Sequence, residues 1–318
     1  MHGGPQASKL IAECLCGENT TDISATMVAM STPRPTLEQL PLRAALDNAM
    51  PKPDERTGKQ ADKKNYAERL SREIARLLAD RLRAHFPRAR VTPYEDGTGQ
   101  EFRVGNGLDR KKTDVGVWDD AAGLILGGSI KTYSFRDYVS RTDQLGRMVK
   151  NVKRNDMELR DEADVLHRRQ PYAVLYALFF QPRSASWDGV QDKSSFAHAV
   201  FTFRKRQGRD DADSPRYDKF ERIFIGLYEE DGPRRGHVEF FDVARSPRKN
   251  QPPDGLTIDL EQLVSEMVRS VRVRNGLADD EERYSADIVW SRPEAPAVQI
   301  HSESLQQSDV LGGGARID

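Results

Sequence analysis

The chain has 318 residues with 49 basic and 50 acidic side chains, which gives a net charge of −1 at pH 7. Its two cysteines are too few for a disulfide framework or for a zinc site made of four cysteines. The longest uncharged apolar stretch, residues 171–182, is shorter than the roughly 20 residues that a membrane-spanning helix needs, so we expect a cytoplasmic protein.

The first half of the chain predicts two helices followed by three strands. Residues 36–49 are expected to form a short helix, and residues 51–60, rich in proline, glycine and charge, are expected to form a linker. From residue 62 to residue 87, apolar side chains recur every three or four positions, which predicts an amphipathic helix. The predicted strands are residues 90–92, 113–118 and 123–131. Asp119 and Asp120 fit a hairpin turn between the second and third of these strands.

The second half predicts a long helix over residues 142–168, with a kink near Asn155. Residues 172–180 are aromatic-rich and uncharged, which is typical of a strand buried on both faces. The remaining expected elements are a helix or strand at 195–206, the two strands of a hairpin at 222–228 and 237–243, and a helix at 256–273. The order of the core is therefore helix, three strands, helix, strand, which indicates an α/β protein.

The functional prediction depends on Asp114 and Lys131. Asp114 lies in an apolar strand pattern and Ser129-Ile130-Lys131 ends the next strand, so a hairpin can bring the two positions to the same side of a sheet. Mg²⁺ takes one or two carboxylates, several waters and phosphate oxygens, and Mn²⁺ is an alternative metal. Such a metal polarises a scissile phosphate, while a neighbouring lysine positions or deprotonates the attacking water.

The strand order, with Asp114 and Ser129-x-Lys131 on adjacent strands, resembles the PD-(D/E)xK superfamily of restriction-endonuclease-like nucleases over residues 62–182. The resemblance implies a restriction-endonuclease-like core, αβββαβ, with a mixed central sheet flanked by helices. It also implies Asp114 as metal ligand, Lys131 as the residue that activates water, and the Ile130 carbonyl as a further ligand. Ser129 departs from the family because an acidic residue usually stands there.

The resemblance implies that a carboxylate from a neighbouring helix then completes the metal site. Glu73 is favoured, because it lies at the apolar edge of the first long helix, where the family often places a glutamate. The same helical count directs Glu68 to the opposite side. Glu158, or with less support Asp143, could instead reach the site from the second long helix.

Charge is segregated along the chain. Residues 131–154 hold seven basic and two acidic side chains, a net charge of +5, whereas residues 278–318 hold nine acidic and three basic ones, a net charge of −6. A basic stretch that begins at the predicted site suits contacts with DNA phosphates. The expected DNA-binding residues are Arg110, Lys111, Lys112, Arg147, Lys150, Asn151 and Arg154.

From these observations we expect four segments. Residues 1–58 form a flexible N-terminal segment with a short helix, 59–182 the nuclease core, 183–291 a C-terminal extension of the same domain, and 292–318 a disordered acidic tail. The expected function is a Mg²⁺-dependent endonuclease acting on double-stranded DNA, in bacterial restriction or antiphage defence and with a homodimer cutting both strands. The alternatives are a catalytically weak or inactive DNA-binding or interaction subunit of a defence complex, and a DNA-repair nuclease.

Overall fold

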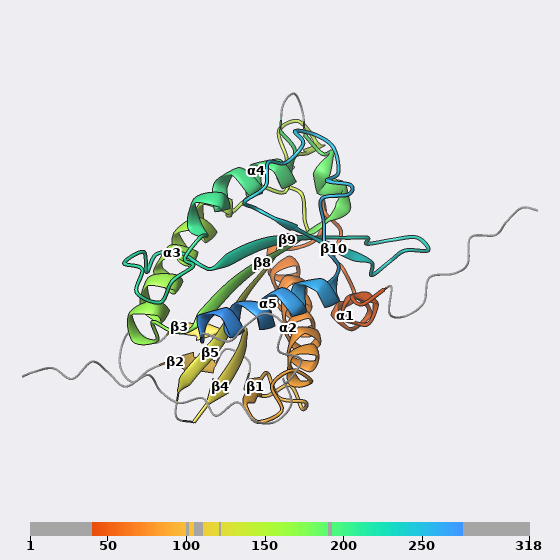
Figure 1. The fold of residues 1–318 in the computed structure, drawn as a ribbon. Coiled ribbons are helices and arrows are strands. Elements are labelled where there is room, and N and C mark those ends of the chain that lie inside the picture. The colour runs from red at the N-terminus through yellow and green to blue at the C-terminus, as the bar shows by residue number, and fades with distance from the viewer. Residues whose placement is uncertain (1–39, 100–101, 105–110, 121, 190–192, 276–318) are drawn as a thin grey trace, which may run out of the picture. The chain divides into compact units, whose positions relative to one another are not determined.

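A mixed six-stranded sheet forms the centre of the protein, with the strand order β1-β4-β5-β8-β9-β10 (Figure 1). The neighbours β5, β8 and β9 are parallel, whereas β1, β4 and β10 are antiparallel to their partners. The strands are β1 (Arg90–Thr92), β4 (Val115–Asp119), β5 (Gly123–Thr132), β8 (Val174–Pro182), β9 (Arg222–Tyr228) and β10 (Val238–Asp242).

The computed structural model describes residues 40–99, 102–104, 111–120, 122–189 and 193–275, and of residues 102–104 and 111 it describes only the backbone. The described residues all belong to one compact unit. Within them, two small sheets accompany the central one: β2 (Phe102–Val104) with β3 (Lys111–Thr113), and β6 (Tyr138–Val139) with β7 (Gln144–Leu145). The acidic tail expected at 292–318 lies outside the described residues.

Helices cover both faces of the sheet, as Figure 1 shows. One face packs against α1 (Arg43–Ala49), α2 (Gln60–Arg83) and α5 (Leu260–Arg274), and the other packs against α3 (Val152–Arg169) and α4 (Ser195–Phe203). Two short 3₁₀ helices, η2 (Arg183–Ser186) and η3 (Arg204–Arg206), flank α4 in the chain. Among the helices of the described residues, none is both long and apolar enough to cross a lipid bilayer.

The strand predicted at residues 172–180 is confirmed as β8, and all of its residues are buried. Successive side chains of a strand point to opposite faces, so β8 contributes to both cores: Leu178 packs in the core beneath α2 and α5, and Phe179 in the core beneath α3 and α4. The predicted hairpin at 222–243 is also confirmed, as the antiparallel pair β9 and β10. The expected α/β class with a mixed central sheet is therefore observed.

The structure differs from the expected long helix over residues 142–168, because α3 begins only at Val152. The preceding residues form β7 and turns, and both Asp143 (φ 49°) and Asn151 (φ 72°) adopt left-handed backbone conformations, which a helix cannot contain. Asn155, where a kink was expected, lies in the first turns of α3.

Two further expectations need correction. The strand expected at 113–118 is divided at Asp114 into β3 and β4. The short helix expected within the flexible N-terminal segment is observed as α1, but Leu46 and Ala49 of this helix are buried in the core that α2 shares. Within the described residues, the sheet domain therefore starts before residue 59.

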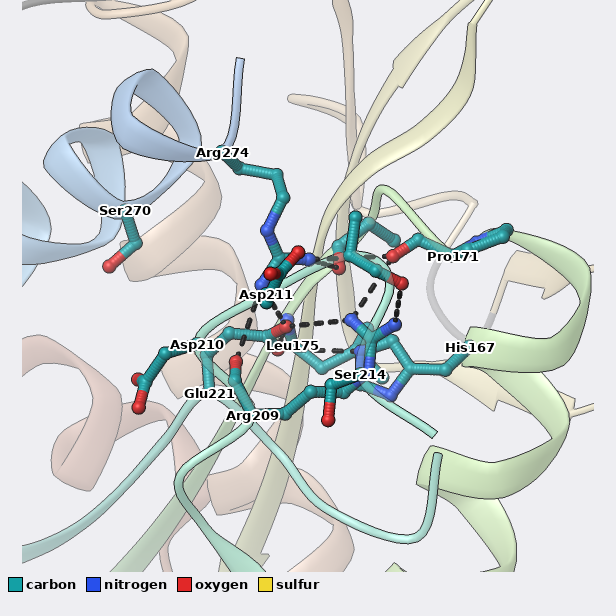
Figure 2. A network of polar contacts seen from close by, with 12 residues as sticks. His167, Pro171, Leu175, Arg209, Asp210, Asp211, Ser214, Glu221, Ser270 and Arg274 are labelled. Atoms are coloured by element: carbon teal, nitrogen blue, oxygen red, sulfur yellow. Dashed lines mark hydrogen bonds and ion pairs between the residues drawn. The ribbon is translucent and has the colours of Figure 1, made fainter. Parts of the chain in front are cut away.

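A buried charged network joins three parts of the fold (Figure 2). Glu221, which precedes β9, accepts a hydrogen bond from the Leu175 N–H of β8 (2.6 Å) and one from Arg274 of α5 (2.7 Å). Arg209 and His167 each approach the same carboxylate to 3.4 Å. Burial by itself would raise the pKa of Glu221, but its buried neighbours hold that pKa below its usual value.

We expect Glu221→Gln to lower the free energy of unfolding by about 3–5 kcal/mol at pH 7, because it leaves buried guanidinium groups without their counter-charge. Asp210→Asn is the control: Asp210 pairs with Arg222 at the surface, and its loss should cost less than about 1 kcal/mol. Urea unfolding monitored by circular dichroism gives both values.

The difference between wild type and Glu221→Gln should also depend on pH. A carboxyl with a lowered folded-state pKa stabilises the protein above its unfolded-state pKa, about 4.3, and loses that contribution as the pH falls through the lower folded-state value. The difference should therefore shrink below about pH 4. A difference that stays constant with pH would contradict this role for the network.

Candidate functional site

The antiparallel register of β4 and β5 brings Asp114 to the Ser129-Ile130-Lys131 segment. Val115 pairs with Gly128, and the backbone N–H of Asp114 donates to the Gly128 carbonyl (3.0 Å). In addition, Asp114 Oδ2 accepts a hydrogen bond of 2.6 Å from the backbone N–H of Ile130. Asp114 is therefore hydrogen-bonded to Ile130, the middle residue of the Ser129-Ile130-Lys131 segment.

Ser129 and Lys131 share the face of β5 that α3 covers. The buried Ser129 hydroxyl donates to Glu162 Oε2 of α3 (3.2 Å), and alternation along the strand places Lys131 on the same face. Tyr133 follows on that face, and its hydroxyl is hydrogen-bonded to Asn155 near the start of α3. Ile130, by contrast, packs in the opposite core beneath α2.

Asp114 also lines a polar pocket of about 530 Å³ beside α2. Glu68, Ser71 and Arg72 form the helical side of the pocket, and the turn at residues 97–99 forms another part of its wall. The pocket therefore presents Asp114 to solvent on the side of the sheet that α2 covers. It combines carboxylate groups with the guanidinium group of Arg72, so both a cation and a phosphate find complementary charge there.

The structure does not bring Glu73 to Asp114 among the contacts that it describes. Glu73 accepts a hydrogen bond from Asn48 (2.9 Å), in the last turn of α1, and another from Arg76 (3.1 Å). At 100° per residue, Glu73 is directed about 140° away from Glu68, and the Glu68 side of α2 faces Asp114. The apolar edge that suggested an inward role for Glu73 packs in the core that α1 shares, so Glu73 has a structural partner there.

The two alternative carboxylates also have other partners. Glu158 of α3 forms an ion pair with Arg154 (2.7 Å), and Asp143 forms one with Arg56 (2.8 Å) in the turn between β6 and β7. The carboxylate of α3 that reaches the Ser-x-Lys segment is Glu162, one turn beyond Glu158. It is 8% exposed.

Sequence reasoning missed Glu162, although the sequence contains a signal for it. Asn155, Glu158 and Glu162 follow one another at spacings of three and four, so they continue one polar series along the helix. At its far end this series enters an apolar stretch, where Leu159, Ala163 and Leu166 are all buried. A carboxylate in such a position requires a polar partner, and Ser129 supplies one.

The predicted DNA-binding residues gather in part at the start of α3. Lys150, Asn151 and Arg154 are exposed there, and Arg147 donates to the Lys193 carbonyl (2.9 Å). The contact between Tyr133 and Asn155 holds this end of α3 beside the end of β5. Lys112 is exposed in β3, where Lys111 is described by its backbone alone, and Arg110 lies outside the described residues.

The donor atoms of the site suit a hard cation such as Mg²⁺. Among the described residues, no group of three or more His, Cys, Asp or Glu side chains could hold a metal by themselves. Mg²⁺ does not need such a group, because one or two carboxylates with waters and phosphate oxygens suffice. Asp114, Glu68 of the same pocket and the Ile130 carbonyl supply oxygen atoms of the required kind.

Comparisons of the chain with protein-family models, curated proteins and solved structures found no match.

We expect Asp114→Ala to lower the free energy of unfolding by about 1–3 kcal/mol, because the Ile130 N–H loses its acceptor. Asp114→Asn retains a side-chain oxygen and should lose less than about 1 kcal/mol. Denaturant unfolding of both variants measures the difference. Equal losses would show that the hydrogen bond to Ile130 does not hold this part of the sheet together.

Proposed function

We propose that the protein is a Mg²⁺-dependent endonuclease of the PD-(D/E)xK kind that hydrolyses phosphodiester bonds of double-stranded DNA. The observation that carries the proposal is the 2.6 Å hydrogen bond between the Asp114 carboxylate and the Ile130 N–H. It joins the two parts of the motif, which lie on different strands, within one small region. The motif is short, so its value as a functional signal depends on this proximity.

The topology around the motif supports the same proposal. Apart from β2, β3, β6 and β7, which form the two small sheets, the elements α2, β1, β4, β5, α3 and β8 follow one another as helix, three strands, helix and strand, which is the order that the resemblance implies. The strands β1, β4 and β5 are antiparallel, and β8 runs parallel to β5. Asp114 directly precedes β4 and Lys131 lies near the end of β5. Because these strands are antiparallel, both residues are at the same end of the sheet.

Each residue of the site has a proposed role. Asp114 and the Ile130 carbonyl would hold the metal, and Glu68, which lines the same pocket as Asp114, would supply the carboxylate that is missing at position 129. Glu162 would remain bonded to Ser129 on the face of β5 that α3 covers. When bound, Mg²⁺ would polarise the scissile phosphate and stabilise the leaving oxygen. Lys131, near the end of β5, orients the attacking water or accepts its proton.

The proposed substrate follows from charge. Lys150 and Arg154 are exposed at the start of α3, beside the end of β5, where they can contact the phosphates that flank the scissile bond. These contacts carry no base specificity, so they position the duplex for cleavage. We propose restriction or antiphage defence in the cytoplasm as the biological role, with a homodimer cutting both strands.

One observation favours a second candidate, a DNA-binding subunit that does not cleave. Ser129 stands where the family usually has a metal-binding carboxylate, and Glu68, which lines the pocket of Asp114, forms an ion pair with Lys64 (3.5 Å). A carboxylate that already pairs with a lysine is less available to a cation. For this candidate, DNA binding persists but no cleavage occurs with any divalent metal.

Incubation of the purified protein with modified and unmodified plasmid DNA, with Mg²⁺, Mn²⁺ or EDTA, tests the proposal. We expect cleavage that requires metal. In Asp114→Asn and Lys131→Ala, cleavage should fall about 100-fold or more, because each removes a group that acts on the reacting atoms. DNA binding measured without metal should persist in both variants.

Three matched carboxylate variants identify the second acidic ligand. Glu68→Gln should lose cleavage, because Glu68 lines the pocket of Asp114. Glu73→Gln and Glu158→Gln should retain most of it, because the carboxylates of Glu73 and Glu158 are engaged by side chains outside the site. Full activity in Asp114→Asn or Lys131→Ala would contradict the nuclease assignment. Full activity in Glu68→Gln alone would remove only Glu68 from the proposed metal site.

A further inference from the structure

An exposed aromatic residue on α4 is contacted by two cationic side chains. Most of the apolar residues of α4 are buried against the sheet, but Phe201 is 44% exposed. The Lys193 ammonium group lies 5.1 Å from the centroid of the Phe201 ring, and the Arg204 guanidinium group lies 5.5 Å from it. The ring is therefore partly accessible to solvent and lies beside positive charge.

Arg204 is held rigidly in this arrangement. Its Nε donates to the Val243 carbonyl (3.0 Å), and its Nη2 donates to the Arg245 carbonyl (2.5 Å). Both acceptors follow β10, so the guanidinium group is anchored to the end of the sheet. Lys193 has no comparable anchor among the contacts that the structure describes for its ammonium group, so it can move aside when a ligand approaches the ring.

Cations from two further elements approach the same place. His198 lies one turn before Phe201 in α4, and its pKa is lowered first by burial and then by the charges of Arg147, Lys193 and Lys153. Arg147 also donates to the Lys193 carbonyl (2.9 Å), which ties the turn before α3 to the start of α4. We call this surface the α4 patch; it consists of Arg147, Lys153, Lys193, His198, Phe201 and Arg204.

Two carboxylates close to the α4 patch are engaged elsewhere. Asp156, one turn after Lys153, binds Arg206 (2.8 Å) and Lys205 (2.9 Å). Asp188 accepts from the backbone N–H of Ser195 (2.7 Å) and from its hydroxyl (2.5 Å) at the start of α4. The charge of Asp156 is thus offset by two cations, and the carboxylate of Asp188 is directed to the start of α4, so the α4 patch, with its five cationic or imidazole side chains, keeps an excess of positive charge.

We propose that the α4 patch binds an unpaired nucleotide of the DNA substrate, with Phe201 stacking on the base and Arg147, Lys153 and Lys193 contacting phosphates. An aromatic ring beside a cationic groove is the combination that binds single-stranded nucleic acid, because every base has a face that can stack. Lys153 lies next to Arg154 in the first turn of α3, so the α4 patch continues the basic surface that leads from the proposed cleavage site. The inference rests on the proposed DNA substrate and adds a strand-separated or flipped-out nucleotide to it.

Fluorescence anisotropy with a labelled single-stranded oligonucleotide and a blunt duplex, both in EDTA, tests the inference. Phe201→Ala should weaken binding of the single strand about 10-fold and leave duplex binding nearly unchanged, because only an unpaired base can stack on the ring. Phe201→Trp should restore binding. Tyr172→Ala, which removes an aromatic residue of similar exposure after the other end of α3, should have no effect.

Charge variants give a second readout. The double variant Arg147→Ala, Lys153→Ala should lower the slope of log K against log salt concentration by about 1–2, since each cation neutralises about one phosphate. Single-strand binding that Phe201→Ala leaves unchanged would overturn the inference and would leave an acidic protein segment as the ligand of the α4 patch.

The two proposals fail in different ways. Binding that depends on Phe201, together with no cleavage under any metal, would retain the α4 patch and reject the nuclease. Cleavage that depends on Asp114, together with binding that is independent of Phe201, would retain the nuclease and reject the α4 patch.

Discussion

Burial of β8 on both faces is the constraint on which the arrangement of the other elements depends. Every residue of this strand is buried, so its two edges must be paired by other strands and both of its faces must be covered by helices. The parallel neighbours β5 and β9 satisfy the edges, while α2 and α5 cover one face and α3 and α4 the other. The carboxyl ends of these parallel strands lie at the same end of the sheet, and the proposed site is at that end.

The chemistry of the site follows from how β5 is paired on its other side. β4 runs antiparallel to β5, so the start of β4 meets the end of β5, and Asp114 is bonded to Ile130. The same strand turns Ser129 toward α3, where Glu162 accepts its hydrogen bond. One strand thus connects a carboxylate in the plane of the sheet with a second carboxylate from a covering helix.

Local pattern was sufficient for β8, for the β9–β10 hairpin and for the proximity of Asp114 to Ser129-Ile130-Lys131, because apolar runs and turn residues determine them. It failed where distant packing decides. The residues before α3 have a helical composition, yet left-handed conformations at Asp143 and Asn151 stop the helix. The rotation of 100° per residue along α2 predicts the direction of the Glu73 side chain, but it cannot predict that this side chain contacts Asn48 of α1. Glu221 and Arg274 are too far apart in sequence for any local pattern to pair them.

The most direct test of the central claim, that Asp114 and the Ser129-Ile130-Lys131 segment form a metal site, is an anomalous difference map from crystals grown with Mn²⁺. The account predicts a peak about 2.2 Å from a carboxylate oxygen of Asp114, in contact with the Ile130 carbonyl and absent from crystals of Asp114→Asn. A map in which Mn²⁺ binds elsewhere, or in which the peak persists unchanged in Asp114→Asn, would contradict it.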